Sequence, residues 1–256
     1  MLYKADQTVQ KKIESLFKGL ENTMIQTYLE GHMGEAWVDD LDKPTAAQIT
    51  VSIFTFYAGN HHSPAAEEML ENLPEDALVI TESEGWKQKL EAMHEGAFEK
   101  YSRYRFEHIA EFFDRNHLKK LVTQLPEPYS VRKIDQRVIE LPSLHQLSPD
   151  FTGNFKSHED FLSRGMGYVV LHEGKVVSGA SSFSIFDEGI EIEVGTDPNY
   201  RRQGLAAVAS AALMLDCLDN NVYPGWDAEN IGSAKLAESL GYVLKEAYDT
   251  YYVSTR

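Results

Sequence analysis

The chain has 256 residues, 43% of them hydrophobic, and it carries a formal net charge of -16. This length predicts one large or two modest globular domains, and the acidity argues against a nucleic-acid partner, which needs basic patches. No apolar run approaches the roughly 20 residues of a membrane helix, the first residues do not resemble a signal peptide, and the single Cys217 excludes an intramolecular disulfide framework. We therefore expect a cytoplasmic protein that binds neither nucleic acid nor membrane.

The N-terminal half is expected to combine helices and strands. Its apolar pattern predicts helices over 6–18, 22–30, 64–72 and 85–94, and strand-like runs over 35–39, 48–58, 77–81 and 98–107. At its end, Leu125–Pro128 holds two prolines in a short span that neither a helix nor a central strand tolerates well. A boundary at this point predicts an N-terminal α/β domain over 1–125 and a second domain over 126–256.

The second domain begins with an expected edge strand over 129–137 and a helix over 157–164 with Ser157 as its N-cap. Strands over 167–172, 175–186 and 190–196 are joined by tight turns, which predicts an antiparallel meander. A helix over 204–220, a short strand, a helix over 232–240 and two last strands over 242–247 and 250–253 follow. The fold class is therefore α/β, with a mixed and mostly antiparallel sheet flanked by helices.

A turn of the form R-x-x-G-x-A comes soon after the third strand of the meander. It consists of Arg201, Arg202, Gln203, Gly204, Leu205 and Ala206 and opens the alanine-rich helix. Small residues leave the backbone amides uncovered and the helix dipole adds positive potential, so such a turn can hold a pyrophosphate. The two arginines can add charge-assisted hydrogen bonds to phosphate oxygens. We expect a phosphorylated cofactor at this turn.

The succession of strand, turn, alanine-rich helix, short strand and helix resembles the GNAT superfamily of N-acetyltransferases. The pattern P-x-W-D-x-x-N-x-x-S-x-x-L-A-x-x-L-G-Y, from Pro224 to Tyr242, is most similar to the subgroup that contains zwittermicin A resistance proteins. The resemblance implies acetyl-CoA as co-substrate. It also implies a β-bulge at the end of the strand, where the backbone amides of Val194, Gly195 and Thr196 would hold the pantetheine arm.

The resemblance extends to the helix after the splayed strands, which in the family follows N-x-x-A-x-x-x-Y-x-x-x-G-F. This chain has Asn230, Ser233, Ala237, Gly241 and Tyr242 at those steps. Asn230 and Ser233 are thus expected near the cofactor, or as local hydrogen-bonding residues at a helix start. Ala237 stands where many members carry the tyrosine that protonates the leaving thiolate. That role is vacant or passes to Tyr248, Tyr251 or Tyr252, each of which could instead be a packing aromatic.

The N-terminal half has a similar order of elements but no phosphate-binding turn, since Gly59–Ser63 occupies the corresponding position. Two interpretations are open. The half is either a degenerate second copy, which shapes the acceptor site or a dimer interface, or an unrelated α/β cap. A common strand order in the two sheets would favour the first.

Acetyl transfer to an amine requires a group that accepts the amine proton. Glu193 is the first candidate, Asp227 the second and Glu191 the third. Glu191 and Glu193 alternate with apolar residues along one strand and so share a face. The two glutamates could equally form a solvated strand face, and Asp227 could cap the helix that follows it.

We expect an N-acetyltransferase that moves acetyl from acetyl-CoA to a primary amine of a small molecule by direct attack in a ternary complex. The alternative is a non-catalytic acyl-CoA-binding module. The acidic surface favours a cationic substrate, and a homodimer is compatible with the sequence. No histidine spacing suggests a metal site.

Overall fold

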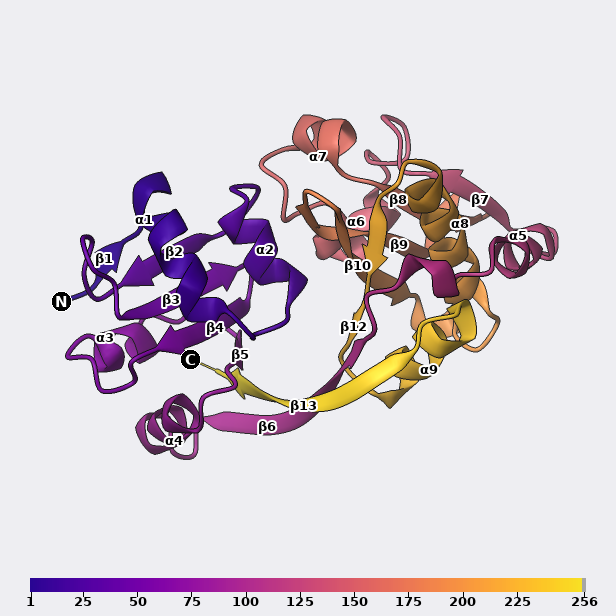
Figure 1. Cartoon of the computed structure of the whole chain (residues 1–256). Helices are drawn as coiled ribbons and strands as arrows, with labels where there is room; N and C mark the ends of the chain where they lie inside the picture. The colour runs from indigo at the N-terminus through magenta and orange to yellow at the C-terminus, as the bar shows by residue number, and fades with distance from the viewer. Residues whose placement is uncertain (255–256) are drawn as a thin grey trace. The chain divides into compact units, whose positions relative to one another are not determined.

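The computed structural model describes residues 1–254 and divides into two compact units (Figure 1). Unit 1 comprises Met1–Arg103 together with the chain from Tyr248 onward, and unit 2 comprises Tyr104–Ala247. The prolines at 126 and 128 lie inside unit 2, in the connection between α5 (Arg115–Thr123) and β7 (Ser130–Lys133). The compact units therefore divide at 103/104, whereas the prolines predicted a division at 125/126, because these prolines end a helix without ending a folded unit.

Unit 1 contains the succession of helices and strands that its sequence predicted, with a short strand added at the start, a 3₁₀ helix after the first α-helix and two strands in place of the single run over 48–58. Its elements are β1 (Tyr3–Lys4), α1 (Gln7–Ile13), the 3₁₀ helix η1 (Glu14–Phe17), α2 (Thr23–Leu29), β2 (Glu35–Val38), β3 (Ala46–Val51), β4 (Phe54–Gly59), α3 (Ala66–Glu71), β5 (Ala77–Ile80), α4 (Glu84–Met93) and β6 (Phe98–Phe106). The single run expected over 48–58 is wrong, because Ser52 adopts a left-handed φ of 54° and turns the chain between β3 and β4.

Side-chain caps define the starts of the unit 1 helices. Asp6 accepts hydrogen bonds from the first-turn amides of α1, Asn22 from α2 and Ser83 from α4. The caps satisfy amides that have no partner within the helix, which explains why helices of seven to ten residues begin at these positions.

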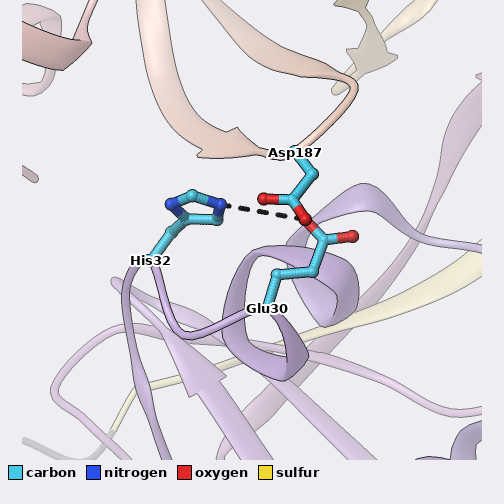
Figure 2. Close-up of side chains that lie close together, drawn as sticks. All are labelled: Glu30, His32 and Asp187. Carbon is cyan, nitrogen blue, oxygen red and sulfur yellow. Dashed lines mark ion pairs between the residues drawn. The ribbon is translucent and has the colours of Figure 1, made fainter.

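The segment after α2 brings a histidine close to a carboxylate. His32 Nε2 lies 3.9 Å from Glu30 Oε2, as Figure 2 shows for these two side chains.

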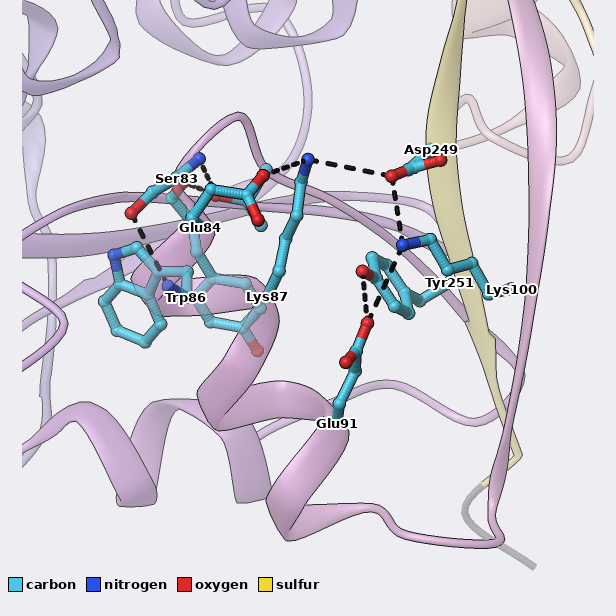
Figure 3. A network of polar contacts seen from close by, with 10 residues as sticks. Ser83, Glu84, Trp86, Lys87, Glu91, Lys100, Asp249 and Tyr251 are labelled. Carbon is cyan, nitrogen blue, oxygen red and sulfur yellow. Dashed lines mark hydrogen bonds and ion pairs between the residues drawn. The ribbon is translucent and has the colours of Figure 1, made fainter.

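The C-terminal strand β13 (Leu244–Val253) completes the sheet of unit 1. It is one continuous strand, so the expected break between 247 and 250 is wrong. Its last residues pair antiparallel with β5, with Tyr251 opposite Val79. The buried Tyr251 donates to Glu91 Oε1 at 2.7 Å, and Asp249 lies 3.1 Å from Lys100 Nζ (Figure 3). Core packing and polar contacts thus hold residues 249–253 in unit 1.

Unit 2 is built around a five-stranded sheet of order β11-β10-β9-β8-β7. Its remaining elements are the 3₁₀ helix η2 (Ala110–Phe112), α6 (Pro142–Leu147), η3 (Pro149–Phe151), α7 (His158–Arg164), β8 (Gly167–His172), β9 (Lys175–Phe186), β10 (Gly189–Thr196), η4 (Pro198–Tyr200), α8 (Leu205–Asp219), β11 (Tyr223–Gly225), β12 (Asp227–Ala228) and α9 (Ile231–Leu240). Strands β7 to β10 are antiparallel and β11 is parallel to β10. The predicted meander is confirmed.

Helices cover both faces of this sheet. Tyr168 and Ala180 are opposite each other on β8 and β9, and the Tyr168 hydroxyl donates to Asp216 of α8 at 3.2 Å. Gly179 is next to Ala180 in β9 and therefore faces the opposite side of the sheet. A Cβ built at Gly179 would lie 3.0 Å from the Phe151 ring, so η3 lies on that side. The alanine-rich helix α8 therefore packs on one face, while α6 and η3 lie against the other.

The two units repeat one order of elements. In unit 1 the strands follow the order β1-β2-β3-β4-β5, with antiparallel pairs up to β4 and a parallel pair of β4 with β5. In unit 2 the order β7-β8-β9-β10-β11 has the same directions. Two helices also follow the first strand of each set. This is the common strand order that a degenerate second copy predicts.

The last strand of each copy departs from a simple repeat. Residues Tyr104 and Arg105 of β6 pair with β12 in unit 2, whereas residues 251–253 of β13 pair with β5 in unit 1. The two copies thus exchange their last strands.

Among residues 1–254, no helix combines the length and apolar character that crossing a bilayer requires.

Candidate functional site

The site predicted from the sequence lies where β10 and β11 diverge. β11 pairs only with Gly189–Glu191 at the start of β10, whereas the pairing of β10 with β9 continues to Thr196. The next strand, β12, pairs with β6 instead. The register therefore contains the splay that the family resemblance implied, on the side of β10 that β11 leaves.

The β-bulge lies earlier than expected. The register between β9 and β10 shifts between Glu191 and Ile192, opposite Ser184 and Ser182, so Phe183 of β9 is the extra residue. The expectation of a bulge at 194–196 is wrong, because the irregularity belongs to the partner strand and precedes the strand end. Val194, Gly195 and Thr196 remain regularly paired with β9.

Hydrogen bonds and packing hold the end of β10. Ser178 Oγ lies 2.7 Å from Thr196 Oγ1 and donates to the Gly195 carbonyl at 3.0 Å. A Cβ at Gly195 would lie 3.2 Å from Phe151, closer than an ordinary contact. The absence of a side chain at Gly195 thus lets η3 pack closely against this strand.

The R-x-x-G-x-A turn forms as one unit at the start of α8. Arg202 and Gly204 both adopt left-handed conformations, with φ of 65° and 78°, and Gly204 is the N-cap of the 15-residue helix. Residues 201–204 are exposed, and a Cβ built at Gly204 would meet no other protein atom within 4 Å. Uncovered amides and a helix N-terminus thus coincide, an arrangement that favours anions.

Glu193 is held by a residue that the sequence interpretation missed. The hydroxyl of Ser148, which lies between α6 and η3, donates to Glu193 Oε1 at 3.1 Å. Ser148 is only 8% exposed, whereas Glu193 is half-buried. The two residues are 45 positions apart, and no local motif marks Ser148 as a partner of the carboxylate. The structure therefore gives Glu193 a defined environment beside η3.

Glu191 is much less accessible than Glu193. It is 4% exposed, and a Cβ built at Gly225 would lie 2.8 Å from its Oε2 atom. Burial raises the pKa of the Tyr223 hydroxyl, and the charge of Glu191 raises it further. Glu191 thus lies against β11, where the strands are still paired, and a substrate amine would reach it less readily than Glu193.

Asp227 lies on β12, opposite Arg105 of β6, and is half-buried. It does not cap the following helix. Asn230 has that role, because its Oδ1 accepts from Gly232 N at 2.9 Å and from Ser233 N at 3.0 Å. Ser233 Oγ accepts from Trp226 Nε1 at 3.2 Å. The capping interpretation of Asp227 is therefore wrong, and both residues suggested near the cofactor on α9 also have local hydrogen bonds.

The tyrosines considered as replacement acids pack or bond elsewhere. Ala237 is fully buried within unit 2, so a side chain at this position is directed into the core. Tyr251 donates to Glu91 and Tyr252 donates to Asp76 at 2.6 Å, all within unit 1. Tyr248 is 9% exposed. The hydrogen bond and burial of Tyr251 thus favour its packing interpretation, and the role of the family tyrosine stays unassigned.

Unit 1 has the same divergence of strands but uses its own side chains there. β5 pairs with β4 only at Phe54–Phe56. Beyond that point, Thr81 Oγ1 donates to the Tyr57 carbonyl at 3.0 Å and Trp86 Nε1 donates to the Gly59 carbonyl at 3.1 Å. The helix that follows, α3, has only six residues. The Tyr57 and Gly59 carbonyls of β4 are therefore bonded within unit 1, and α3 is much shorter than the 15-residue α8.

The strand order, the splay and the turn are features that the family resemblance implied, and the comparison of sequences assigns the chain to that family. The sequence profile of the GNAT acetyltransferase family matches residues 14–251, and the chain belongs to this family. It is 25% identical over 229 residues to the uncharacterized N-acetyltransferase YdfB of Bacillus subtilis (strain 168), covering 86% of this chain and 85% of the relative. The zwittermicin A resistance subgroup stays a prediction.

Solved structures show the same fold. A GCN5-related N-acetyltransferase-like protein from Streptococcus suis 89/1591 is 38% identical, with a TM-score of 0.88 and coverage of 95% of this chain and 98% of that chain. A tandem GNAT protein from the clavulanic acid biosynthesis pathway is 11% identical, with a TM-score of 0.57 and coverage of 100% and 99%. Both likenesses extend over both units, in agreement with a tandem of two GNAT-like copies.

Proposed function

We propose that this protein is an acetyl-CoA-dependent N-acetyltransferase that moves acetyl to a primary amine of a small molecule by direct attack in a ternary complex. The observation that carries the proposal is the left-handed turn at Arg202 and Gly204, at the N-terminus of α8, which follows η4 and the strand β10 that diverges from β11. Members of the family use acetyl-CoA, and these residues fit that co-substrate.

The open space at Gly204 agrees with a bound pyrophosphate, because a Cβ added there would meet no other protein atom within 4 Å. Backbone amides of residues 202–206 are proposed to hold the pyrophosphate, with Arg201 and Arg202 adding charge-assisted hydrogen bonds. Val194–Thr196 would hold the pantetheine arm from the β10 side, and Asn230 and Ser233 would approach it from α9. Acetyl-CoA would supply the thioester, and the chain would supply its orientation.

Glu193 is proposed to accept the proton of the substrate amine. Its carboxylate is half-buried and is held by the Ser148 hydroxyl, so it keeps one orientation beside the diverging strands. The amine nitrogen forms a bond to the thioester carbonyl carbon, the C–S bond breaks, and the amine proton passes to Glu193. Asp227 ranks second, and Glu191 ranks third because it is buried against Gly225.

No acid is needed for the departing thiolate in this scheme. A thiol has an ordinary pKa of about 8.5, so the thiolate is a stable leaving group near neutral pH. Positioning of the amine and the thioester in one complex can supply much of the acceleration. The proposed reaction therefore does not depend on a tyrosine at the position of the buried Ala237.

Release of free CoA thiol with a panel of cationic amines tests the proposal. Turnover that depends on the amine and increases as the amine loses its proton would support it. Tight binding of acetyl-CoA without thiol release across a broad panel would instead support the second candidate, a non-catalytic acyl-CoA-binding module, which the buried Ala237 favours. No binding of acetyl-CoA would overturn both.

A further inference from the structure

Four side chains at one edge of the unit 2 sheet contact one another in series beside the R-x-x-G-x-A turn. Tyr129 directly precedes β7, His172 ends β8, and Tyr200 and Gln203 belong to the segment that follows β10. β8 and β10 run in the same direction and β7 runs against them, so the start of β7 and the ends of β8 and β10 lie at the same edge. Residues far apart in the sequence are thereby brought to the turn.

These side chains contact the turn on both sides of its arginines. The Tyr129 hydroxyl donates to Gln203 Oε1 at 2.8 Å. His172 Nδ1 lies 3.0 Å from the Tyr200 hydroxyl, and the ring centroids of Tyr129 and His172 are 4.9 Å apart. Tyr200 immediately precedes Arg201, and Gln203 lies between the two left-handed residues Arg202 and Gly204.

The turn has a conformational cost that such contacts can offset. A left-handed conformation at a residue with a side chain, as at Arg202, is unfavourable in an isolated chain. It persists where the surroundings hold it. Tyr129 holds the residue that follows Arg202, and His172 holds the residue that precedes Arg201, so together they limit the conformations of the segment that presents the amides.

We propose that Tyr129 and His172 are positioning residues that keep the turn in its anion-binding conformation before the cofactor arrives. The inference rests on the proposed function, because it assigns the pyrophosphate of acetyl-CoA to this turn. Tyr129 acts through Gln203 and His172 acts through Tyr200. Preorganised amides bind an anion more tightly because less ordering remains to be done on binding.

Tyr129→Phe is the most direct test, because it removes one hydroxyl and keeps the ring. It should weaken CoA binding roughly fivefold, the equivalent of one net hydrogen bond, with kcat unchanged at saturating acetyl-CoA. The kcat/KM for acetyl-pantetheine, a donor without the pyrophosphate, should not change. Tyr168→Phe is the matched control, since it removes a tyrosine hydroxyl bonded to Asp216 in the same unit, and it should leave CoA affinity unchanged.

A double-mutant cycle shows whether Tyr129 acts through Gln203. In a Gln203→Ala protein, Tyr129→Phe should have no further effect on CoA affinity. An equal loss with both donors would indicate a general loss of structure and overturn the inference. Unchanged CoA affinity in Tyr129→Phe would overturn this inference alone, whereas no CoA binding by the unaltered protein would overturn the proposed function as well.

Discussion

Replacement of Gly204 is expected to separate cofactor binding from folding. Gly204 has φ of 78°, and a Cβ added there meets no protein atom within 4 Å. Gly204→Val would therefore cause no internal clash, and its cost to folding is the left-handed conformation, about 1–2 kcal/mol. The same side chain would stand over the amides proposed to hold the pyrophosphate. We expect CoA affinity to fall by at least about tenfold, or 1.4 kcal/mol.

Calorimetric titration with CoA and urea unfolding measure these two effects separately. Gly204→Asn is the matched control for backbone strain, because asparagine tolerates the left-handed region better than valine does. It should unfold at nearly the same urea concentration as the unaltered protein and still weaken CoA binding, since it also adds a side chain. CoA affinity that is unchanged in both folded variants would refute the assignment of the turn.

Three further outcomes follow from the site. Glu193→Gln should lower kcat/KM by about a hundredfold or more, and the residual rate should recover as pH rises because free amine then forms in solution. Near-normal activity of this variant, together with loss of activity in a folded Asp227→Asn protein, would move the role of base to Asp227. Ser148→Ala should shift the acid limb of the kcat/KM profile toward higher pH, because the charged carboxylate loses a hydrogen-bond donor; an unshifted profile would show that Ser148 does not act on the base. Calorimetry should find one CoA per chain, because Trp86 and Thr81 bond the β4 carbonyls in unit 1, and a second site would contradict that interpretation.

Local sequence signals were sufficient for most elements of unit 2. The strands over 167–172 and 175–186 have the predicted bounds. The N-cap Ser157 and the left-handed Gly241 stand at the predicted helix ends. Such signals depend on neighbouring residues, since a cap, a turn or an apolar period is completed within a few positions. The turn at Ser52 was missed because it contains neither glycine nor proline, although its backbone is left-handed.

The turn before α8 was also indicated by the sequence, because a glycine ahead of an alanine-rich helix has a local physical meaning, and the structure has left-handed residues there. The distant residues that contact the site residues were not evident from the sequence. Ser148 donates a hydrogen bond to Glu193, 45 positions away, and Tyr129 donates one to Gln203, 74 positions away. The exchange of β6 and β13 and the bond from Trp86 to the Gly59 carbonyl likewise depend on strand pairing and packing. Tertiary structure decided these features, because contacts between distant residues arise only when the sheets close and have no period or motif in the chain.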